Sequence, residues 1–192
     1  VADGEFRVTG SIASGGQVQG NGEVTGAGTI GGGLRVADFG ANAGTVNPGV
    51  STGDNTGNLT INGNLTVDEP STTAGDGGNF VFDLGAPVAN QTSAALAADS
   101  DHLTVGGNAD FDGFVSFNNT GAVSSGFYEL ASVGGTTNLT ISHDDSDFGA
   151  TPLANHAYHV LEDGSGNIDL AIADMPNLVL TNSLVDFGTF VG

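Results

Sequence analysis

Polar and apolar side chains alternate without a break over residues 58–67, NLTINGNLTV. Successive side chains of an extended strand point to opposite faces, so this pattern gathers the apolar residues on one face. Those residues are Leu59, Ile61, Leu65 and Val67. The pattern predicts a half-buried β-strand. Asn47-Pro48-Gly49 predicts a turn ahead of it, because proline fixes φ and glycine accepts a positive φ.

Further apolar alternations follow along the chain. They involve Phe80, Phe82, Leu84, Leu103, Val105, Phe111, Val115 and Phe117. The alternations that begin at positions 59, 80 and 103 lie about 20 residues apart, which is typical of one solenoid repeat. Later strands are predicted over residues 127–133, 138–142, 157–161, 167–173 and 177–182. These recur about every 10 residues, a spacing that suits a β-sandwich as well as a solenoid.

Glycine supplies 33 of the 192 residues, well above the usual share of about 7%. Because glycine makes tight corners sterically possible, we expect many short strands joined by corners. The sequence therefore predicts an all-β fold, a parallel β-helix (β-solenoid), with its rungs in residues 1–117. Residues 118–175 continue it, cap it or form a small β-sandwich, and residues 176–192 form a terminal strand. The alternative is a jelly roll or β-sandwich throughout.

Several short motifs carry a family resemblance. They are GAGTIGGGLRV (26–36), GTVNPGVSTG (44–53), GNLTINGNLTV (57–67), FVFDLG (80–85) and SDHLTVGGNADFDGFVSF (100–117). Their order resembles the autotransporter-type β-helix passenger and the autotransporter-associated β-strand repeat, including surface proteins with PEP-CTERM-type anchors. The resemblance covers about residues 20–175. It implies a right-handed β-solenoid that is secreted or displayed at the cell surface, and it does not imply an enzyme.

The last residues, VDFGTFVG (185–192), resemble the opening strand of an immunoglobulin-like domain. Such a domain needs further strands, so either the chain is cut from a longer protein or this strand pairs with another molecule. If the strand is donated to a neighbouring subunit, its interface side chains are Val185, Phe187 and Val191. The other possibility is that it folds back on its own sheet.

The charge balance is extreme, with 22 acidic residues against two arginines and a formal net charge of −20. Such a surface repels phosphate backbones and anionic headgroups, so the sequence predicts no nucleic-acid partner and no membrane-surface binding. No apolar run reaches the ~18 residues of a transmembrane helix, which predicts no membrane insertion. The charge also favours a saline or divalent-rich extracellular medium, although acidic composition alone is common in secreted proteins.

Calcium is the ion that the candidate ligands in the sequence favour most, and no cofactor is predicted to be required. Asp144, Asp145 and Asp147 fall close together in a predicted loop. Asn108, Asp110 and Asp112 match the start of an acidic calcium loop, but position twelve is Asn119 where a bidentate glutamate is needed. Alternation of the neighbouring apolar residues predicts a strand there, so the competing interpretation is a solvated outer face.

The four histidines suggest weaker sites. His156 and His159 are three apart in a predicted strand, which places their rings on opposite faces and prevents them from sharing a metal. His102 follows Asp101, and His143 precedes Asp144. Loops could gather such groups into a histidine-carboxylate cluster. Surface histidines in turns are the commoner explanation.

Catalytic patterns are scarce. The chain has no cysteine, no serine in a recognisable triad context, and only Arg7 and Arg35 to neutralise an acidic sugar. A pair of carboxylates for glycoside hydrolysis ranks low because none sits in an obvious motif. Five N-x-T sequons are candidate glycosylation sites or ordinary surface residues of a solenoid. They are Asn58, Asn64, Asn90, Asn118 and Asn138.

Together these patterns predict a non-enzymatic, extracellular structural protein whose partners are copies of itself. Pairing of exposed strands between subunits would give a filament, a sheath or a surface layer. The alternative is a spacer or adhesin segment of a larger bacterial surface protein.

Overall fold

A computed structural model describes residues 3–39, 42–49, 56–68, 77–88, 100–141, 148 and 150–175. Within these residues every regular element is a β-strand, and no helix occurs. The all-β prediction is therefore confirmed.

The strands form three sheets. Sheet A contains, in order, β1 (Asp3–Arg7), β4 (Asn21–Gly26), β8 (Thr45–Pro48), β11 (Gly78–Leu84) and β14 (Gly113–Asn119). Sheet B contains β2 (Ser11–Ile12), β5 (Thr29–Ile30), β9 (Asn58–Ile61), β12 (His102–Val105), β15 (Gly126–Val133), β18 (Ile168–Asp174) and β17 (His156–Glu162). Sheet C contains β3 (Gly16–Gln19), β6 (Leu34–Phe39), β10 (Leu65–Val67), β13 (Ala109–Phe111) and β16 (Thr137–Leu139), with β7 (Asn42–Ala43) paired to β6.

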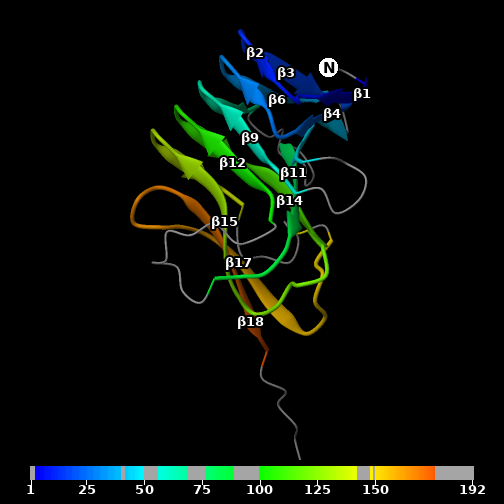
Figure 1. The fold of residues 1–192 in the computed structure, drawn as a ribbon, viewed down its shortest axis with the longest axis vertical. Helices are drawn as coiled ribbons and strands as arrows, with labels where there is room; N and C mark the ends of the chain where they lie inside the picture. The colour runs from blue at the N-terminus through cyan, green and yellow to red at the C-terminus, as the bar shows by residue number, and fades with distance from the viewer. Residues whose placement is uncertain are drawn as a thin grey trace, which may run out of the picture.

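The chain visits sheets A, B and C in turn and repeats this circuit five times, from β1 through β16. The strands of successive circuits pair in parallel, for example β1 with β4 and β12 with β15. Figure 1 shows these coils stacked along the long axis of the molecule, beginning at the blue N-terminal end. This is a parallel β-helix, so the alternative of a jelly roll or sandwich throughout is wrong. Its right hand stays a prediction from the resemblance.

The coils differ in length, but the inward-facing residues of successive coils remain in register. Ser11 pairs with Thr29, 18 positions later, but Asn58 pairs with His102, 44 positions later. The predicted repeat starting at positions 59, 80 and 103 is therefore wrong in part. Leu59 pairs with Leu103 in sheet B, whereas Phe80 lies in sheet A and pairs with Val115. The extra residues fall between strands, where they leave the stacked core positions unchanged.

Residues 58–67 form two strands in place of the single predicted one. β9 and β10 belong to sheets B and C, and residues 62–64 form the corner between them. Leu59, Ile61 and Leu65 are fully buried as predicted, because the three-residue corner restores the same inward parity on both sides. The B-to-C corner is three residues long in all five coils.

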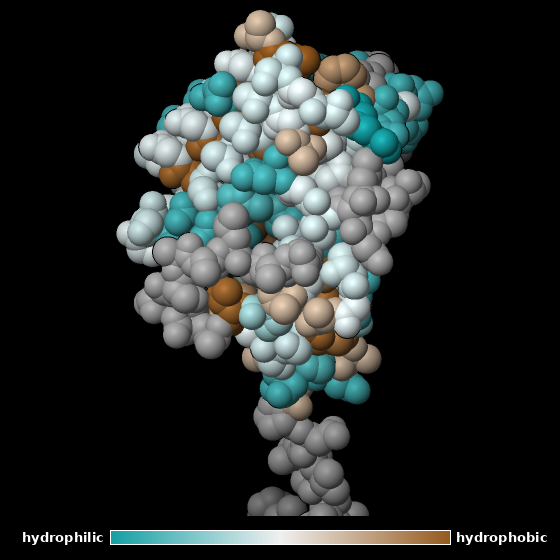
Figure 2. All heavy atoms as spheres, viewed as in Figure 1, coloured by the Kyte–Doolittle hydropathy of each residue, from teal (hydrophilic) through white to brown (hydrophobic). Residues whose placement is uncertain are grey.

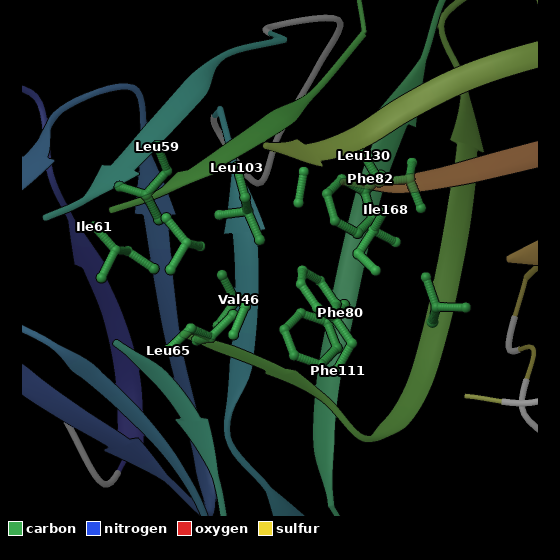
Figure 3. Packing of buried hydrophobic residues seen from close by; sticks show 14 of the residues in the cluster. Val46, Leu59, Ile61, Leu65, Phe80, Phe82, Leu103, Phe111, Leu130 and Ile168 are labelled. Carbon is green, nitrogen blue, oxygen red and sulfur yellow. The ribbon is translucent and has the colours of Figure 1, made fainter. Parts of the chain in front are cut away.

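The core is one continuous column of inward side chains, drawn from all three sheets (Figure 3). Phe80 contacts Phe111 with ring centroids 5.0 Å apart, and Phe82 stacks on Phe117 at 6.5 Å. All four rings are about 1% exposed. Phe82 and Phe117 are in-register partners in sheet A, whereas Phe80 and Phe111 meet across the core from sheets A and C. Each such aromatic pair adds about 0.5–1.5 kcal/mol beyond burial.

The C-terminal end of the column is closed by a hairpin. β17 and β18 pair antiparallel, and β18 joins the last parallel strand of sheet B, β15. Phe148 bridges to Val115 in sheet A. Tyr158 of the hairpin stacks on Phe117 at 6.1 Å. The strands predicted at 127–133, 157–161 and 167–173 are confirmed as β15, β17 and β18, whereas 177–182 and the whole terminal strand lie outside the described residues.

Candidate functional site

Asparagines at the B-to-C corner tie successive coils together. The Oδ1 atom of Asn64 accepts a hydrogen bond from the N–H of Asn108 (3.0 Å), and the Oδ1 atom of Asn108 accepts one from the N–H of Thr136 (3.0 Å). A Cβ on Gly107 would collide with the Asn64 side-chain oxygen, and one on Gly135 would collide with the Asn108 side-chain oxygen. Glycine is therefore required above each asparagine, and we call this arrangement the corner ladder.

Asp101 is a fully buried carboxylate between sheets A and B. Its Oδ1 atom accepts from the N–H of Gly57 (2.8 Å), and its Oδ2 atom accepts from the N–H of Asp83 (2.9 Å). Burial raises the pKa of Asp101 to about 7, although the two backbone hydrogen bonds act in the opposite direction. Asp83 itself accepts from the side-chain amide of Asn118 at 2.8 Å. This pair of acids connects three coils.

A second buried cluster lies on the outer face of sheet B. His102 is 4% exposed, and its Nε2 atom lies 3.2 Å from Glu129 Oε1 and 3.0 Å from Ser132 Oγ. Ser132 Oγ also donates to Glu129 Oε1 at 2.7 Å. Residues 129 and 132 would face opposite sides of a regular strand. They face the same side here because the register of β15 shifts between Glu129 and Ala131, as a β-bulge does.

This cluster has serine, histidine and acid, but not in the order of a catalytic triad. A triad needs the serine on one ring nitrogen and the acid on the other. In this protein both contacts use Nε2, while Nδ1 is buried without a hydrogen-bond partner among the described residues. Burial lowers the pKa of His102, and Glu129 partly offsets this effect. Because the folded protein then binds a proton less readily than the unfolded chain, the stabilisation from His102 is lost as the pH falls below the ordinary histidine pKa and through the lowered pKa of the folded protein.

Replacing Glu129 with glutamine is expected to lower the pKa of His102 further, because the partner that favours the charged imidazole is removed. An NMR titration of the histidine ring signals measures this. Glu162→Gln, which changes an exposed acid on β17, serves as the control and should leave the His102 titration unchanged. A His102 titration that is the same in both variants would show that Glu129 does not act on the ring.

The structure places the other predicted site residues apart from one another. Asn108 belongs to the corner ladder, Asp110 pairs with Asn138 across sheet C, and Asp112 lies between β13 and β14. His156 and His159 lie three apart on β17, and His156 Nε2 contacts Asp174 Oδ1 at 2.8 Å. Within the described residues no three histidine, aspartate or glutamate side chains gather as a metal site would require. Asp144, Asp145 and Asp147 lie outside those residues, as do Val185, Phe187 and Val191.

Four of the five sequons fall on described, solvent-facing positions. They are Asn58, Asn64, Asn118 and Asn138. Asn58 Oδ1 accepts from Thr104 Oγ1 at 3.1 Å, and Asn118 donates to Asp83. Asn90 lies outside the described residues. Glycosylation of these positions stays a prediction.

The N-terminal end of the β-helix exposes apolar surface. β1, β2 and β3 are each the terminal strand in their sheet's order. An apolar hollow of about 230 Å³ lies between these strands and those of the second coil. It is lined by Phe6, Ile12, Gly15, Gly16, Gln17, Val24, Ile30 and Leu34. Phe6 is 40% exposed. In Figure 2 hydrophobic atoms, coloured brown, are visible at this upper end of the molecule. We call this region the open end.

Comparison with known proteins adds no family to this description. No protein-family model matches the chain, and a search of curated proteins found no match. The resemblance to autotransporter passengers therefore stays a prediction.

Among the described residues, no helix is long and apolar enough to cross a membrane.

Proposed function

We propose that this protein is an extracellular structural β-helix that associates with copies of itself through β-strand pairing. The observation that carries the proposal is the open end, where three terminal strands surround an apolar hollow. Strands at a sheet edge present backbone donors and acceptors that pair readily with another chain. Repeated association of such units would build a filament, a sheath or a surface layer, with no catalytic role and no required cofactor.

The alternative proposal is a spacer or adhesin segment of a larger surface protein, of the kind that the autotransporter resemblance implies. The stack of five coils favours it, because a β-helix holds its two ends apart along one axis. A spacer of this kind would remain monomeric, whereas a structural subunit would not.

Sedimentation at increasing protein concentration in moderate salt separates the two proposals. A subunit should give masses above the 18.9 kDa of one chain. Phe6→Ser should weaken the association about tenfold or more, because it removes an aromatic side chain from the contact. Met175→Ser is the matched control, since Met175 is the other large exposed apolar side chain of the described residues, 52% exposed, and follows β18 at the opposite end. A constant mass of one chain at every concentration would favour the spacer.

A further inference from the structure

β1 is the outermost strand of sheet A, and among the described strands its only neighbour in the sheet order is β4. All five of its residues, Asp3–Arg7, are exposed. Phe6 pairs in register with Val24, which is buried, and both line the hollow of the open end. β1 therefore lies at the outer edge of its sheet and carries an aromatic side chain, Phe6, that contacts the core on one side only.

The backbone of β1 fixes which residues can pair across that edge. The N–H of Val8, which follows β1, donates to the carbonyl oxygen of Thr25 at 2.8 Å. Even-numbered residues thus direct their backbone groups toward β4. Because these directions alternate along a strand, Glu5 and Arg7 direct theirs toward the outer edge. In an antiparallel pair across this edge, odd-numbered residues would form the hydrogen-bonded pairs and Phe6 would occupy a non-hydrogen-bonded position.

The charges of β1 are self-complementary in that arrangement. When the strand pairs with a second copy of itself so that Phe6 lies opposite Phe6, Glu5 of each copy lies opposite Arg7 of the other. Opposite-charge and aromatic cross-strand pairs both stabilise a sheet. Within one chain, Arg7 Nε already lies 3.2 Å from Glu5 Oε1, and the two side chains are 43% and 34% exposed. Both charges therefore sit on the outer face of sheet A, where a second copy could reach them.

We propose that the open end is the contact of a two-fold symmetric dimer, in which β1 pairs antiparallel with β1 of a second copy and the two apolar hollows face each other. A two-fold axis makes the same patch meet itself, which is the commonest symmetry of homo-oligomers. This inference rests on the proposed self-association and gives the geometry of its first contact. Because a two-fold contact closes at two copies, a filament, sheath or layer would require a second contact between such dimers.

The charge distribution favours this end for contact between like chains. Residues 1–39 contain Asp3, Glu5, Glu23 and Asp38 against Arg7 and Arg35, a net charge of −2 out of −20 for the chain. Two open ends can therefore meet while the strongly acidic remainders stay apart.

Head-to-tail stacking of copies would require β1 of one copy to pair with β14, the last strand of sheet A, in the next copy. The structure disfavours this pairing. Phe148 bridges to Val115 of β14, and the N–H of Phe117 donates to the carbonyl oxygen of Ala150 at 2.8 Å. The outer edge of β14 is thus already covered by residues of the same chain. β1 of a neighbouring copy would find no open strand there.

Charge reversal with mixing tests the proposal on the full chain. Glu5→Arg places arginines at both 5 and 7, and Arg7→Glu places glutamates at both, so each variant alone brings like charges together. Each should raise the dimer dissociation constant about tenfold or more, because two attractive pairs become repulsive. An equimolar mixture of the two variants should restore association, since the two arginines of one chain then lie opposite the two glutamates of the other. The double variant Glu5→Arg/Arg7→Glu should dimerise like the original chain.

Sedimentation velocity at one fixed ionic strength measures these constants, and thermal unfolding checks that each variant remains folded. If the original chain associates but mixing restores nothing, the antiparallel β1 contact is wrong and the proposed self-association stands through another surface. If the original chain is monomeric at every concentration, the dimer and the proposed self-association are both wrong. Recovery in the mixture supports the dimer, because a defect in folding of either variant would not be repaired by adding the other.

Discussion

Replacing Gly113 with alanine is expected to destabilise the protein by about 2–6 kcal/mol, the combined effect of backbone strain and a steric collision. Gly113 has a φ of +114°, and a Cβ at this position would collide with the carbonyl oxygen of Gly78, its partner in the neighbouring coil. A non-glycine residue at this φ is strained by about 1–3 kcal/mol. The collision adds about 1–3 kcal/mol, because it is with backbone and β11 must separate from β14 to relieve it.

Gly121→Ala is the matched control for this effect. Gly121 has nearly the same φ, +111°, but a Cβ there would meet nothing within 4 Å. It should show the strain of about 1–3 kcal/mol alone. Urea unfolding measures both free energies. If the two variants are equally destabilised, the close approach of coils at Gly78 and Gly113 does not limit the fold.

Asp101→Asn is expected to change stability by an amount that depends on pH. The asparagine amide can accept from only one of the two N–H groups, of Gly57 and Asp83, that Asp101 holds. Leaving a buried donor without a partner costs about 1–3 kcal/mol. At low pH, where Asp101 is protonated and its burial carries no charge penalty, the original chain should therefore be the more stable.

The difference should shrink or reverse as the pH rises. The pKa of Asp101 is raised to about 7 in the folded protein, so this group binds its proton more tightly there than in the unfolded chain. Its contribution to stability is thus present at low pH and is lost as the pH rises through about 7, by up to about 4 kcal/mol. Unfolding midpoints of both chains at about pH 4, 6 and 8, at constant ionic strength, measure this loss. Parallel pH profiles would show that Asp101 is already ionised throughout.

The strand-forming segments were predictable from alternation, and so was the inward set of residues. Leu59, Phe80, Leu103 and Phe117 are all buried as the pattern indicates. The assignment of strands to sheets was not predictable in the same way. A three-residue corner keeps the alternation intact, so residues 58–67 read as one strand although the chain turns from sheet B to sheet C at residues 62–64. Unequal connections likewise obscured which coil follows which.

The polar clusters of the structure were not predictable from the sequence, for a different reason. The interpretation of His102 as a surface residue was wrong, because its partner Glu129 lies 27 positions away and reaches it only through a β-bulge that no local pattern marks. The sequence makes Asn108 a candidate calcium ligand, and in the structure its Oδ1 atom accepts from the N–H of Thr136 in the next coil. The signal for that role was the glycine in the following corner, since Gly107 lies over the side chain of Asn64 and Gly135 lies over that of Asn108.

The constant B-to-C corner has a consequence for how such a chain can diverge in evolution. Its three residues are locked by contacts with the coils on both sides, whereas the A-to-B connection ranges from two residues between β4 and β5 to seventeen between β11 and β12. The C-to-A connection varies as well, from one residue between β3 and β4 to ten between β10 and β11. Insertions and deletions can therefore accumulate along these two edges without disturbing the stacked core. Homologues should differ in length mainly along these two edges and not at the B-to-C corner, and foreign peptides grafted at either edge would be presented by a scaffold that already accommodates segments of unequal length.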